Sequence, residues 1–545
     1  MTQRSFSRIR PWPGDPGRDL SLFKMGPRAS GPRPRSRGSV TMTVLLLLVV
    51  FTGLGLAMLE ASAIHLKING ARRFSGLLDD ASENGIKRSF ADLASWLETE
   101  ALLAPVGEAR IEALRAAPAQ AFPALLESAL GPAFPRVLEE SFDGLTWISR
   151  AECRLDAVED RGGYLRITAA LRIESSGGLV PIRSRRVSVL EGAIGLLAGR
   201  LPLAAVPLYI KGDRTAGERS AFAAANGIRL ARKPGQPIGP ALAASAAGVL
   251  SDDAGGLAAK ALNIGVFRPG DLSPARLRQA LGLEASADPV PDGVYLIHND
   301  LGLGGIFVQG DLDELVLAIR SDTQIAVFRA GGLEWRLEWS PARGRTEFIS
   351  PQGSAAYELV PLPILFVNGA IAALGGGVVG PGGRVDMSSE DGTPSVLNGV
   401  DLTIVSAKQV TITSHLILEG VRWQDGIPYS KGSQAQLVIF ASGRDVVTGE
   451  AAEEAGIVIA AGAPDRLRIQ AALTTARGGL VIDGTGKSVE LLGALHADSY
   501  QGRGNELVLY RDDRAAAGEL PQNAPLTAEP QLAVCSLKAT AWKEY

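Results

Sequence analysis

The string GTGKS at residues 484–488 is the part of the sequence closest to a phosphate-binding motif. A phosphate-binding loop requires GxxxxGK[ST] between a strand and a helix, but the position of its first glycine is Val481 here. The residues that follow, SVELLGAL, have the pattern of a strand. We therefore expect a tight turn between two strands, with glycine supplying positive φ, and no nucleotide site.

Three carboxylates lie close together in the string GDLDEL: Asp311, Asp313 and Glu314. The alternation of a strand places Asp311 and Asp313 on one face and Glu314 on the other. Clustered carboxylates of this kind bind calcium or act on polysaccharides in β-helix lyases and hydrolases. Because no basic cluster follows nearby in the sequence, we favour a solvated turn over a catalytic or calcium site.

The histidines and cysteines predict no metal centre. His65, His298, His415 and His496 are isolated, without HExxH or another paired spacing, and no GxSxG precedes a helix. The two cysteines, Cys153 and Cys535, are far apart in the sequence. They are expected either to form one bridge in an oxidising compartment or to remain unrelated thiols. We predict no catalytic residue, no cofactor and no metal.

An apolar run occupies residues 40–59, which carry no charge and have about the length that crosses a bilayer. A secretory signal has a shorter apolar region of about 7–15 residues. The string Ala61-Ser62-Ala63 has the form of a cleavage site, which would release a chain starting at Ile64. The length of the run favours a membrane helix that is kept.

Charge is distributed unevenly about this run. Residues 1–38 contain nine Lys/Arg, two Asp/Glu, six Pro and five Gly, whereas the whole chain has 55 basic and 58 acidic residues. The tail is expected to be disordered, and Met25 is an alternative start. The positive-inside rule places the N-terminus in the cytoplasm. The body then lies in the periplasm or outside the cell, anchored once in the inner membrane. The mildly acidic body argues against nucleic acid as a partner.

Helical periodicity continues beyond the apolar run and predicts one long helix over residues 39–100. One face of the extension carries mainly small and apolar residues: Leu66, Gly70, Phe74, Leu77, Ala81, Gly85, Ser89, Leu93 and Trp96. The other face carries charged residues: Lys67, Arg72, Asp79, Glu83 and Lys87. Within the membrane run, Gly53, Ala57 and Ala61 form a small-xxx-small stripe that lets another helix approach closely.

The rest of the chain predicts an α+β fold class with two further parts. Residues 101–290 mix helical patterns with alternating segments at 145–158, 164–174 and 184–192, and end in a loop-rich connector. Ser273 before Pro274 is expected to start a helix. From 291 to 513, short apolar runs are broken by small turns at unequal intervals. They predict an all-β region, an irregular β-helix or solenoid, with a β-sandwich as the alternative. Residues 514–545 are expected to be a loose tail.

The runs behind that all-β expectation each have the pattern strand, tight turn, strand. Six of them occur: IFVQGDLDEL at 306, LFVNGAIAAL at 365, TIVSAKQVTI at 403, VIFASGRDVV at 438, VIAAGAPDRLRI at 458 and LVIDGTGKSVELL at 480.

The N-terminal segment, from RGSVTMTVLLLLVV to ENGIKRSFADL, resembles that of PilX-like type IV pilus assembly proteins. Those proteins have a basic stretch, a Gly-small junction, a Leu/Val-rich run and a helix ending in a motif like AAEAGIE. The corresponding residues here are Gly38 and Ser39 at the junction and ASENGIK, with Ala81, Glu83, Gly85 and Ile86, in the motif. The strings VNGAIAALGGG, VLNGVDLTIVSAKQVTIT and LRIQAALTTARGGLVI resemble a β-rich domain of unknown function often found in such proteins.

The resemblance implies a non-enzymatic, single-pass component of a type IV pilus-like apparatus. Its N-terminal helix would pack in the bilayer or against other pilin-like or pilus-assembly proteins, and its β-rich body would be displayed outside. Major pilins carry Glu five residues after the cleaved glycine, where this chain has Thr43. Processing at Gly38 and permanent anchoring are therefore both open. The alternative function is a membrane-anchored β-helix adhesin or polysaccharide-acting enzyme, with a surface or polysaccharide ligand.

Overall fold

The computed structural model describes most of the chain beyond residue 38. The described ranges are 39–99, 103–130, 136–142, 145–179, 185–205, 208–210, 226–231, 254–299, 302–502, 504–516 and 519–544. The expected basic tail, with Met25 and Gly38, lies outside them, as do residues 211–225 and 232–253 of the expected α+β domain and connector.

The chain divides into two compact units, residues 1–74 and residues 75–545. Helix α1 (Ser39–Thr99) contributes to both and is 61 residues long. It contains no proline, and its first half is rich in leucine, which is a good helix former. The predicted helix over residues 39–100 is therefore confirmed.

A six-stranded antiparallel sheet forms the first part of the second unit. Its order is β1 (Leu103–Pro105), β29 (Gln531–Glu544), β5 (Arg185–Gly199), β4 (Tyr164–Leu179), β3 (Leu145–Asp160) and β2 (Arg136–Phe142). Strands β3, β4 and β5 are the three that the alternating pattern predicts. On β4, odd-numbered residues from Leu165 to Ile173 are buried, and the even-numbered ones are more exposed.

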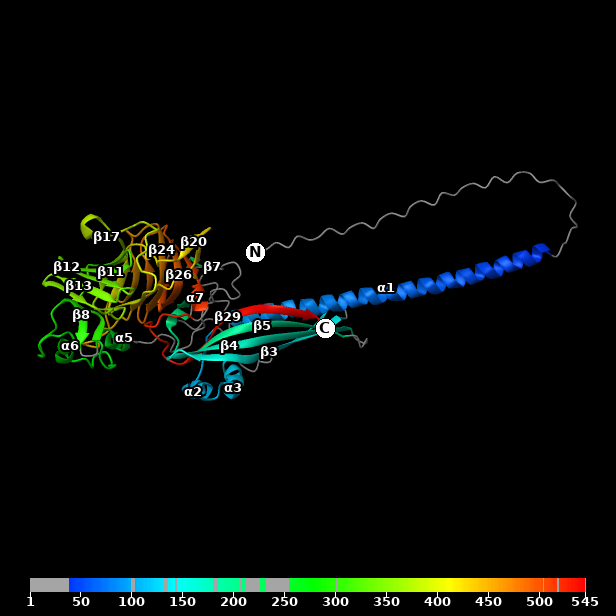
Figure 1. Cartoon of the computed structure of the whole chain (residues 1–545), viewed down its shortest axis with the longest axis horizontal. Coiled ribbons are helices and arrows are strands. Elements are labelled where there is room, and N and C mark those ends of the chain that lie inside the picture. The colour runs from blue at the N-terminus through cyan, green and yellow to red at the C-terminus, as the bar shows by residue number, and fades with distance from the viewer. Residues whose placement is uncertain are drawn as a thin grey trace. The chain divides into compact units, whose positions relative to one another are not determined.

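Strand β29 is the C-terminal end of the chain, and it lies beside β5 (Figure 1). Gln531 pairs with Gly199 at the start of the ladder, so residues 200–530 are inserted between two neighbouring strands of one sheet. The prediction of a loose tail over residues 514–545 is wrong for residues 531–544, which form β29. The polar, proline-containing composition stops at residue 530, and Leu532, Val534 and Leu537 are fully buried.

Three helices share the hydrophobic core of this sheet. Ile86 and Leu93 of α1 belong to one buried cluster with apolar residues of α2 (Glu108–Ala116) and α3 (Pro118–Leu130). The same cluster contains the buried residues of β4 and Leu532 of β29. The C-terminal half of α1 is therefore a packed element of a folded domain.

Two large sheets form the β-rich body. The ten-stranded sheet runs β7 (Ile228–Ala231), β28 (Glu506–Tyr510), β26 (Ser488–Ala497), β24 (Arg466–Thr475), β22 (Gln436–Ala441), β18 (Asp401–Ser406), β15 (Ile364–Asn368), β9 (Gly302–Gln309) and β8 (Gly293–Asn299), with β6 (Leu208–Ile210) on β26. The eleven-stranded sheet runs β14 (Gly353–Tyr357), β13 (Arg345–Ser350), β12 (Leu333–Ser340), β11 (Thr323–Ala330), β10 (Glu314–Arg320), β16 (Ile371–Val379), β19 (Gln409–Ile412), β23 (Gly456–Ile459), β25 (Gly479–Ile482) and β27 (Ser499–Gln501), with β17 (Val385–Met387) on β16.

The chain alternates between these two sheets. The successive pairs β9/β10, β15/β16, β18/β19, β22/β23, β24/β25 and β26/β27 each place their first strand in the ten-stranded sheet and their second in the other. Neighbouring pairs are joined by parallel ladders. Six register partners therefore form one buried apolar row: Ile306, Leu365, Ile404, Ile439, Leu473 and Leu495.

The sequence pattern of strand, tight turn and strand holds for most of the predicted runs, but the two strands lie in different sheets. The run at 438 departs from it, because β22 ends at Ala441 and the next strand, β23, begins at Gly456. The expected boundary at 291 also differs, since β6, from the expected α+β domain, and β7, from the expected connector, pair with β26 and β28 of the body. Alternation within short segments cannot reveal such distant partners.

Smaller elements complete the fold. They are α5 (Ala254–Ala261), α6 (Pro274–Ala280), α7 (Asp513–Ala516), the hairpin β20 (Arg422–Gln424) and β21 (Ile427–Tyr429), and two 3₁₀ turns at Leu203–Ala205 and Pro381–Gly383. Helix α6 begins as predicted, because the Ser273 side chain accepts a hydrogen bond from the Arg276 backbone N–H.

Candidate anchoring and helix-packing surface

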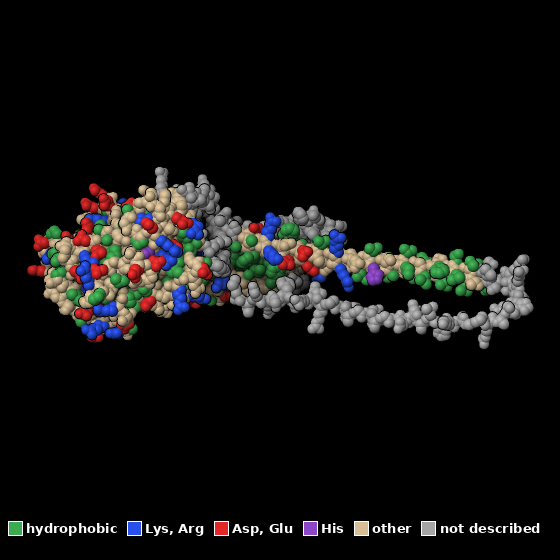
Figure 2. All heavy atoms as spheres, turned by 90° about the horizontal axis from the view of Figure 1, so that it is seen from above, with side chains coloured by type: hydrophobic (Ala, Val, Ile, Leu, Met, Phe, Trp, Pro, Cys, Tyr) green, Lys and Arg blue, Asp and Glu red, His purple; other side chains and the backbone are tan. Residues whose placement is uncertain are grey.

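The N-terminal half of α1 exposes large apolar side chains. Those more than two-fifths exposed include Met42, Leu45, Leu48, Phe51, Leu56, Leu59, Ile64 and Ile68. Figure 2 shows hydrophobic side chains along this part of the helix. In the described part of the chain, α1 is the one helix that is long and apolar enough to cross a membrane, judged by length and composition. A single-pass anchor accounts for this exposure.

The predicted small-residue stripe lies within this exposed half. Gly53, Ala57 and Ala61 recur every four residues, so they share one face of α1. No described atom lies within 4 Å of the position that a side chain on Gly53 would take. Of the predicted junction, Ser39 is the first residue of α1, and Gly38 lies outside the described residues. The stripe is open for the close approach of another helix.

The C-terminal half of α1 is buried along one face. The residues of this face are Leu78, Ala81, Ser82, Gly85, Ile86, Ser89 and Leu93. Leu77, which the sequence pattern assigned to the face, is 43% exposed, and Leu78 takes its place. In the family-like motif, Ala81, Gly85 and Ile86 point inward. Glu83 forms an ion pair with Lys87 instead.

Glycines let the backbone of α1 approach the sheet. A Cβ atom on Gly85 would lie 2.3 Å from Ser175 Oγ and 2.8 Å from Trp147 Cδ1. A Cβ atom on Gly177 of β4 would lie 3.1 Å from the Leu78 carbonyl oxygen and 3.2 Å from Ser82 N. The sequence analysis missed Gly177. The Gly177-Gly178 pair in β4 could have indicated it, because glycine inside a strand marks a close approach of another backbone.

Polar contacts fix the position of α1 along the sheet. Ser82 Oγ and Ser188 Oγ share a buried hydrogen bond of 2.8 Å. Arg186 Nε lies 3.1 Å from Asp79 Oδ1, and its Nη2 donates to Ser75 Oγ at 2.9 Å. The Arg186 contacts are half exposed, so they contribute little to stability, but they define the register of the helix.

The three clustered carboxylates each have a structural partner. Asp311 accepts hydrogen bonds from the Ala370 backbone N–H at 2.8 Å and from Lys408 Nζ at 3.1 Å. Asp313 Oδ2 accepts the Gly331 N–H at 2.8 Å. Burial alone would raise the pKa of Asp311, but its two donors outweigh burial and lower that pKa.

The remaining carboxylate of this cluster, Glu314, pairs with Arg329. Lys408, the partner of Asp311, comes from the distant turn between β18 and β19, whereas Arg329 lies on β11, the hairpin partner of β10. The cluster therefore connects turns of neighbouring strand pairs.

The GTGKS string is the turn between β25 and β26, as the sequence predicts. Gly484 and Gly486 have φ of +83° and +79°, which glycine adopts without strain. The Lys487 side chain is 3% exposed and donates to the Ala463 carbonyl oxygen. A strand follows in place of the helix that a phosphate loop needs. Lys487 therefore stabilises the turn.

His298, His415 and His496 lie in separate surroundings. His415 is buried, and its Nδ1 accepts the Arg468 backbone N–H at 3.0 Å, while burial lowers its pKa. His496 is buried beside Thr474 Oγ1 at 3.2 Å. His298 packs edge-on against Tyr357. Among the described residues, no group of three or more His, Cys, Asp or Glu is placed to hold a metal ion.

The two cysteines are free thiols. Cys153 lies on β3 and Cys535 on β29, and the sheet order places β4 and β5 between them. Three strand spacings amount to about 14 Å, whereas a disulfide needs Cα atoms within about 7 Å. The alternative of an intramolecular bridge is therefore excluded. Burial raises the pKa of Cys153 to about 12 and also raises the pKa of Cys535.

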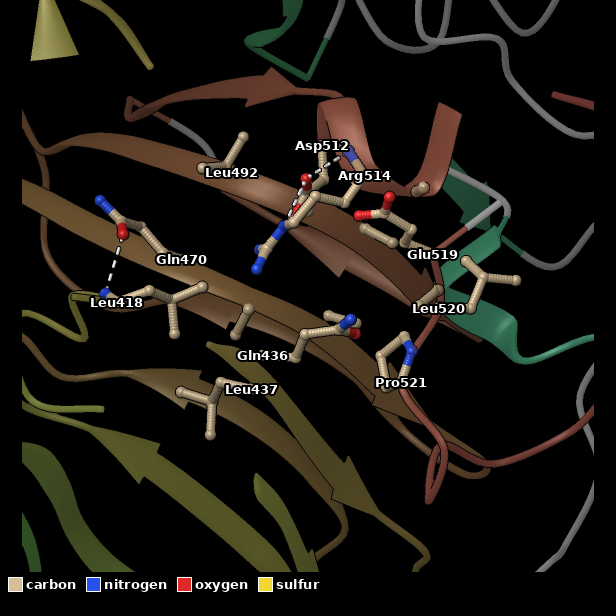
Figure 3. A pocket seen from close by; sticks show the side chains of 16 residues that line it. Leu418, Gln436, Leu437, Gln470, Leu492, Asp512, Arg514, Glu519, Leu520 and Pro521 are labelled. Atoms are coloured by element: carbon tan, nitrogen blue, oxygen red, sulfur yellow. Dashed lines mark hydrogen bonds and ion pairs between the residues drawn. The ribbon is translucent and has the colours of Figure 1, made fainter. Parts of the chain in front are cut away.

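A small cavity lies where residues 512–516 and 519–521 pass beside the ten-stranded sheet (Figure 3). Its volume is about 30 Å³, enough for one or two waters. Arg514 and Asp512 form a buried ion pair beside it, at 2.5 Å. Burial opposes ionisation of Asp512, but hydrogen bonds and charge from Arg514 overcome it and lower the pKa.

The Arg514 guanidinium also donates to the carbonyl oxygen of Ser433. These contacts bind Asp512 and Arg514 to the sheet, and a volume of about 30 Å³ leaves no room for a substrate in this cavity.

Comparison of the chain with protein-family models, with curated proteins and with solved structures found no match.

Proposed function

We propose that the chain is a membrane-anchored, pilin-like structural component that displays a β-rich body outside the cytoplasm. The supporting observation is the division of α1. Its first half exposes apolar side chains over the length of a bilayer, and its second half is packed into an antiparallel sheet. The apolar half partitions into the inner membrane, the small-residue stripe packs against pilin-like partners, and the body carries the contacts outside.

The display body is, in this proposal, an irregular β-helix. The alternation of strand pairs between two sheets and the parallel ladders that join the pairs support it. A β-sandwich is expected to be mainly antiparallel. The body is inserted between β5 and β29, which pair with each other. The sheet against which α1 packs is therefore complete.

A polysaccharide-acting enzyme has less support. The role would need free carboxylates in a groove, and Asp311 and Asp313 are engaged by Lys408 and by backbone N–H groups. We therefore propose a mechanical function without a catalytic residue.

Photo-crosslinking tests the proposed helix packing. A photo-activatable phenylalanine analogue is placed at Ala57, on the stripe, or at Leu59, which lies about 200° away around the helix. The full chain is irradiated in native membranes, and adducts are identified by mass spectrometry. We expect Ala57 to crosslink to the N-terminal apolar helix of a second protein or copy, and Leu59 mainly to lipid. Lipid adducts alone at both positions would exclude packing through the stripe.

A further inference from the structure

Three cations follow the apolar half of α1. Lys67, Arg72 and Arg73 are exposed. No acidic residue lies between Glu60 and Asp79 to neutralise them. Figure 2 shows Lys and Arg side chains where the hydrophobic stretch of the helix ends. We call Lys67, Arg72 and Arg73 the cationic girdle.

The girdle surrounds the helix. At about 100° per residue, Arg72 is about 140° from Lys67, and Arg73 is a further 100° around. The three side chains therefore point in three directions, roughly 120° apart. A protein partner contacts a helix along one face, as in a coiled coil, but the surface of a bilayer surrounds it on all sides.

The axial position of the girdle fits a membrane surface. Residues 40–66 span about 40 Å as a helix, close to the thickness of a bilayer with its headgroups. Lys67 comes at that limit, and Arg72 and Arg73 come about 8 Å beyond it. Side chains on a helix tilt toward its N-terminus, which here is toward the apolar segment. Long basic side chains reach back to a membrane interface in this way.

We propose that the cationic girdle binds anionic phospholipid headgroups on the side of the bilayer from which the folded body extends. This rests on the proposed membrane anchoring and adds a lipid preference to it. The contacts hold α1 at a fixed depth and resist its withdrawal when the body is pulled. Each cation near an anionic surface strengthens association with that surface by several-fold. The three together therefore contribute substantially to lipid binding.

Spin-labelled lipids measure this preference directly. The full chain is reconstituted in phosphatidylcholine vesicles that contain a trace of phosphatidylglycerol or phosphatidylcholine spin-labelled near the end of an acyl chain. Electron spin resonance then gives the fraction of each lipid held at the protein. We expect phosphatidylglycerol to be enriched at low salt, and less so at about 0.5 M salt, where the Debye length is short.

The variant K67Q/R72Q/R73Q separates the girdle from the basic N-terminal tail, which also attracts anionic lipid. We expect it to lower the relative association constant for phosphatidylglycerol by about two-fold or more. The matched control, R110Q/R268Q/R345Q, removes three exposed cations of the body and should leave the constant unchanged.

Equal lipid preference in the girdle variant and the parent chain would overturn the proposal. So would a girdle variant that changes only the oligomeric state, because the partner would then be acidic protein. A chain that holds no lipid of either kind, and is washed from the vesicles, would refute the anchoring itself.

Discussion

Gly85 is the residue on which the packing of α1 depends most clearly. Its missing side chain lets the helix lie against Trp147 and Ser175 of the sheet. Gly76, two and a half turns earlier, has no described atom within 4 Å of its Cβ position. The same change at these two glycines of one helix therefore separates the effect of packing from the effect of helix propensity.

We predict opposite effects for G85A and G76A on the free energy of unfolding. G85A should destabilise the domain by about 1–3 kcal/mol, because the methyl group would clash with Ser175 Oγ and Trp147. G76A should be neutral or stabilise by up to about 1 kcal/mol, because alanine is the better helix former. Pulse proteolysis of the detergent-solubilised chain in increasing urea measures both. A destabilised G76A with an unaffected G85A would show that the helix is seated differently.

The buried thiol of Cys153 predicts how the free energy of unfolding depends on pH. Its pKa is raised in the folded protein, from 9.0 to about 12, because burial disfavours the thiolate. The stability that it contributes is therefore complete below about pH 9 and is lost as pH rises toward 12. We expect the unfolding free energy to fall over this range, and less steeply in C153A.

The thiols themselves are counted by alkylation and mass spectrometry without reductant. The unfolded chain should take up two alkyl groups, and the folded chain should react slowly, because the thiolate is the nucleophile. A chain whose two cysteines were bridged to each other would take up none.

At the scale of elements, β29 is the strand that completes the sheet under α1. Its first residues are buried and pair with both β1 and β5, whereas residues 538–543 are exposed. The sheet is thus completed by a strand that follows the inserted residues 200–530 in the chain. Folding of the N-terminal sheet has to wait for the inserted body.

Two truncations test this dependence. Removal of residues 531–545 should expose residues 75–199 to limited proteolysis, because Leu532, Val534 and Leu537 leave the core. Removal of residues 539–545 should leave protease resistance nearly unchanged, because those side chains pack little. The fragments are compared on gels and by mass spectrometry. If both truncations resist protease equally, the sheet does not require β29.

At the scale of the whole molecule, the sequence predicts local elements well and distant partners poorly. The long helix, three strands of the first sheet, the N-cap at Ser273 and the GTGKS turn follow from periodicity and turn chemistry within a few residues. The insertion of residues 200–530 does not, because the pairing of Gln531 with Gly199 leaves no mark in either segment.

The surface of α1 shows the same limit. The stripe of Gly53, Ala57 and Ala61 and the length of the apolar run can be read directly from the sequence. Ala81, Gly85, Ser89 and Leu93 of the predicted face are buried, but Leu78 is buried in place of Leu77, because helical periodicity alone tolerates either. The partners of Asp311 also come from turns that only the fold brings near.

The central claim is that residues 40–66 are kept as the membrane anchor of a pilin-like chain. The N-terminal sequence of the mature protein, taken from carbonate-washed membranes, tests it most directly. The account predicts that the protein stays with the membrane and begins at Ser39, or upstream of it if the anchor is never processed. A protein that begins at Ile64 and is released from the membrane would contradict the account.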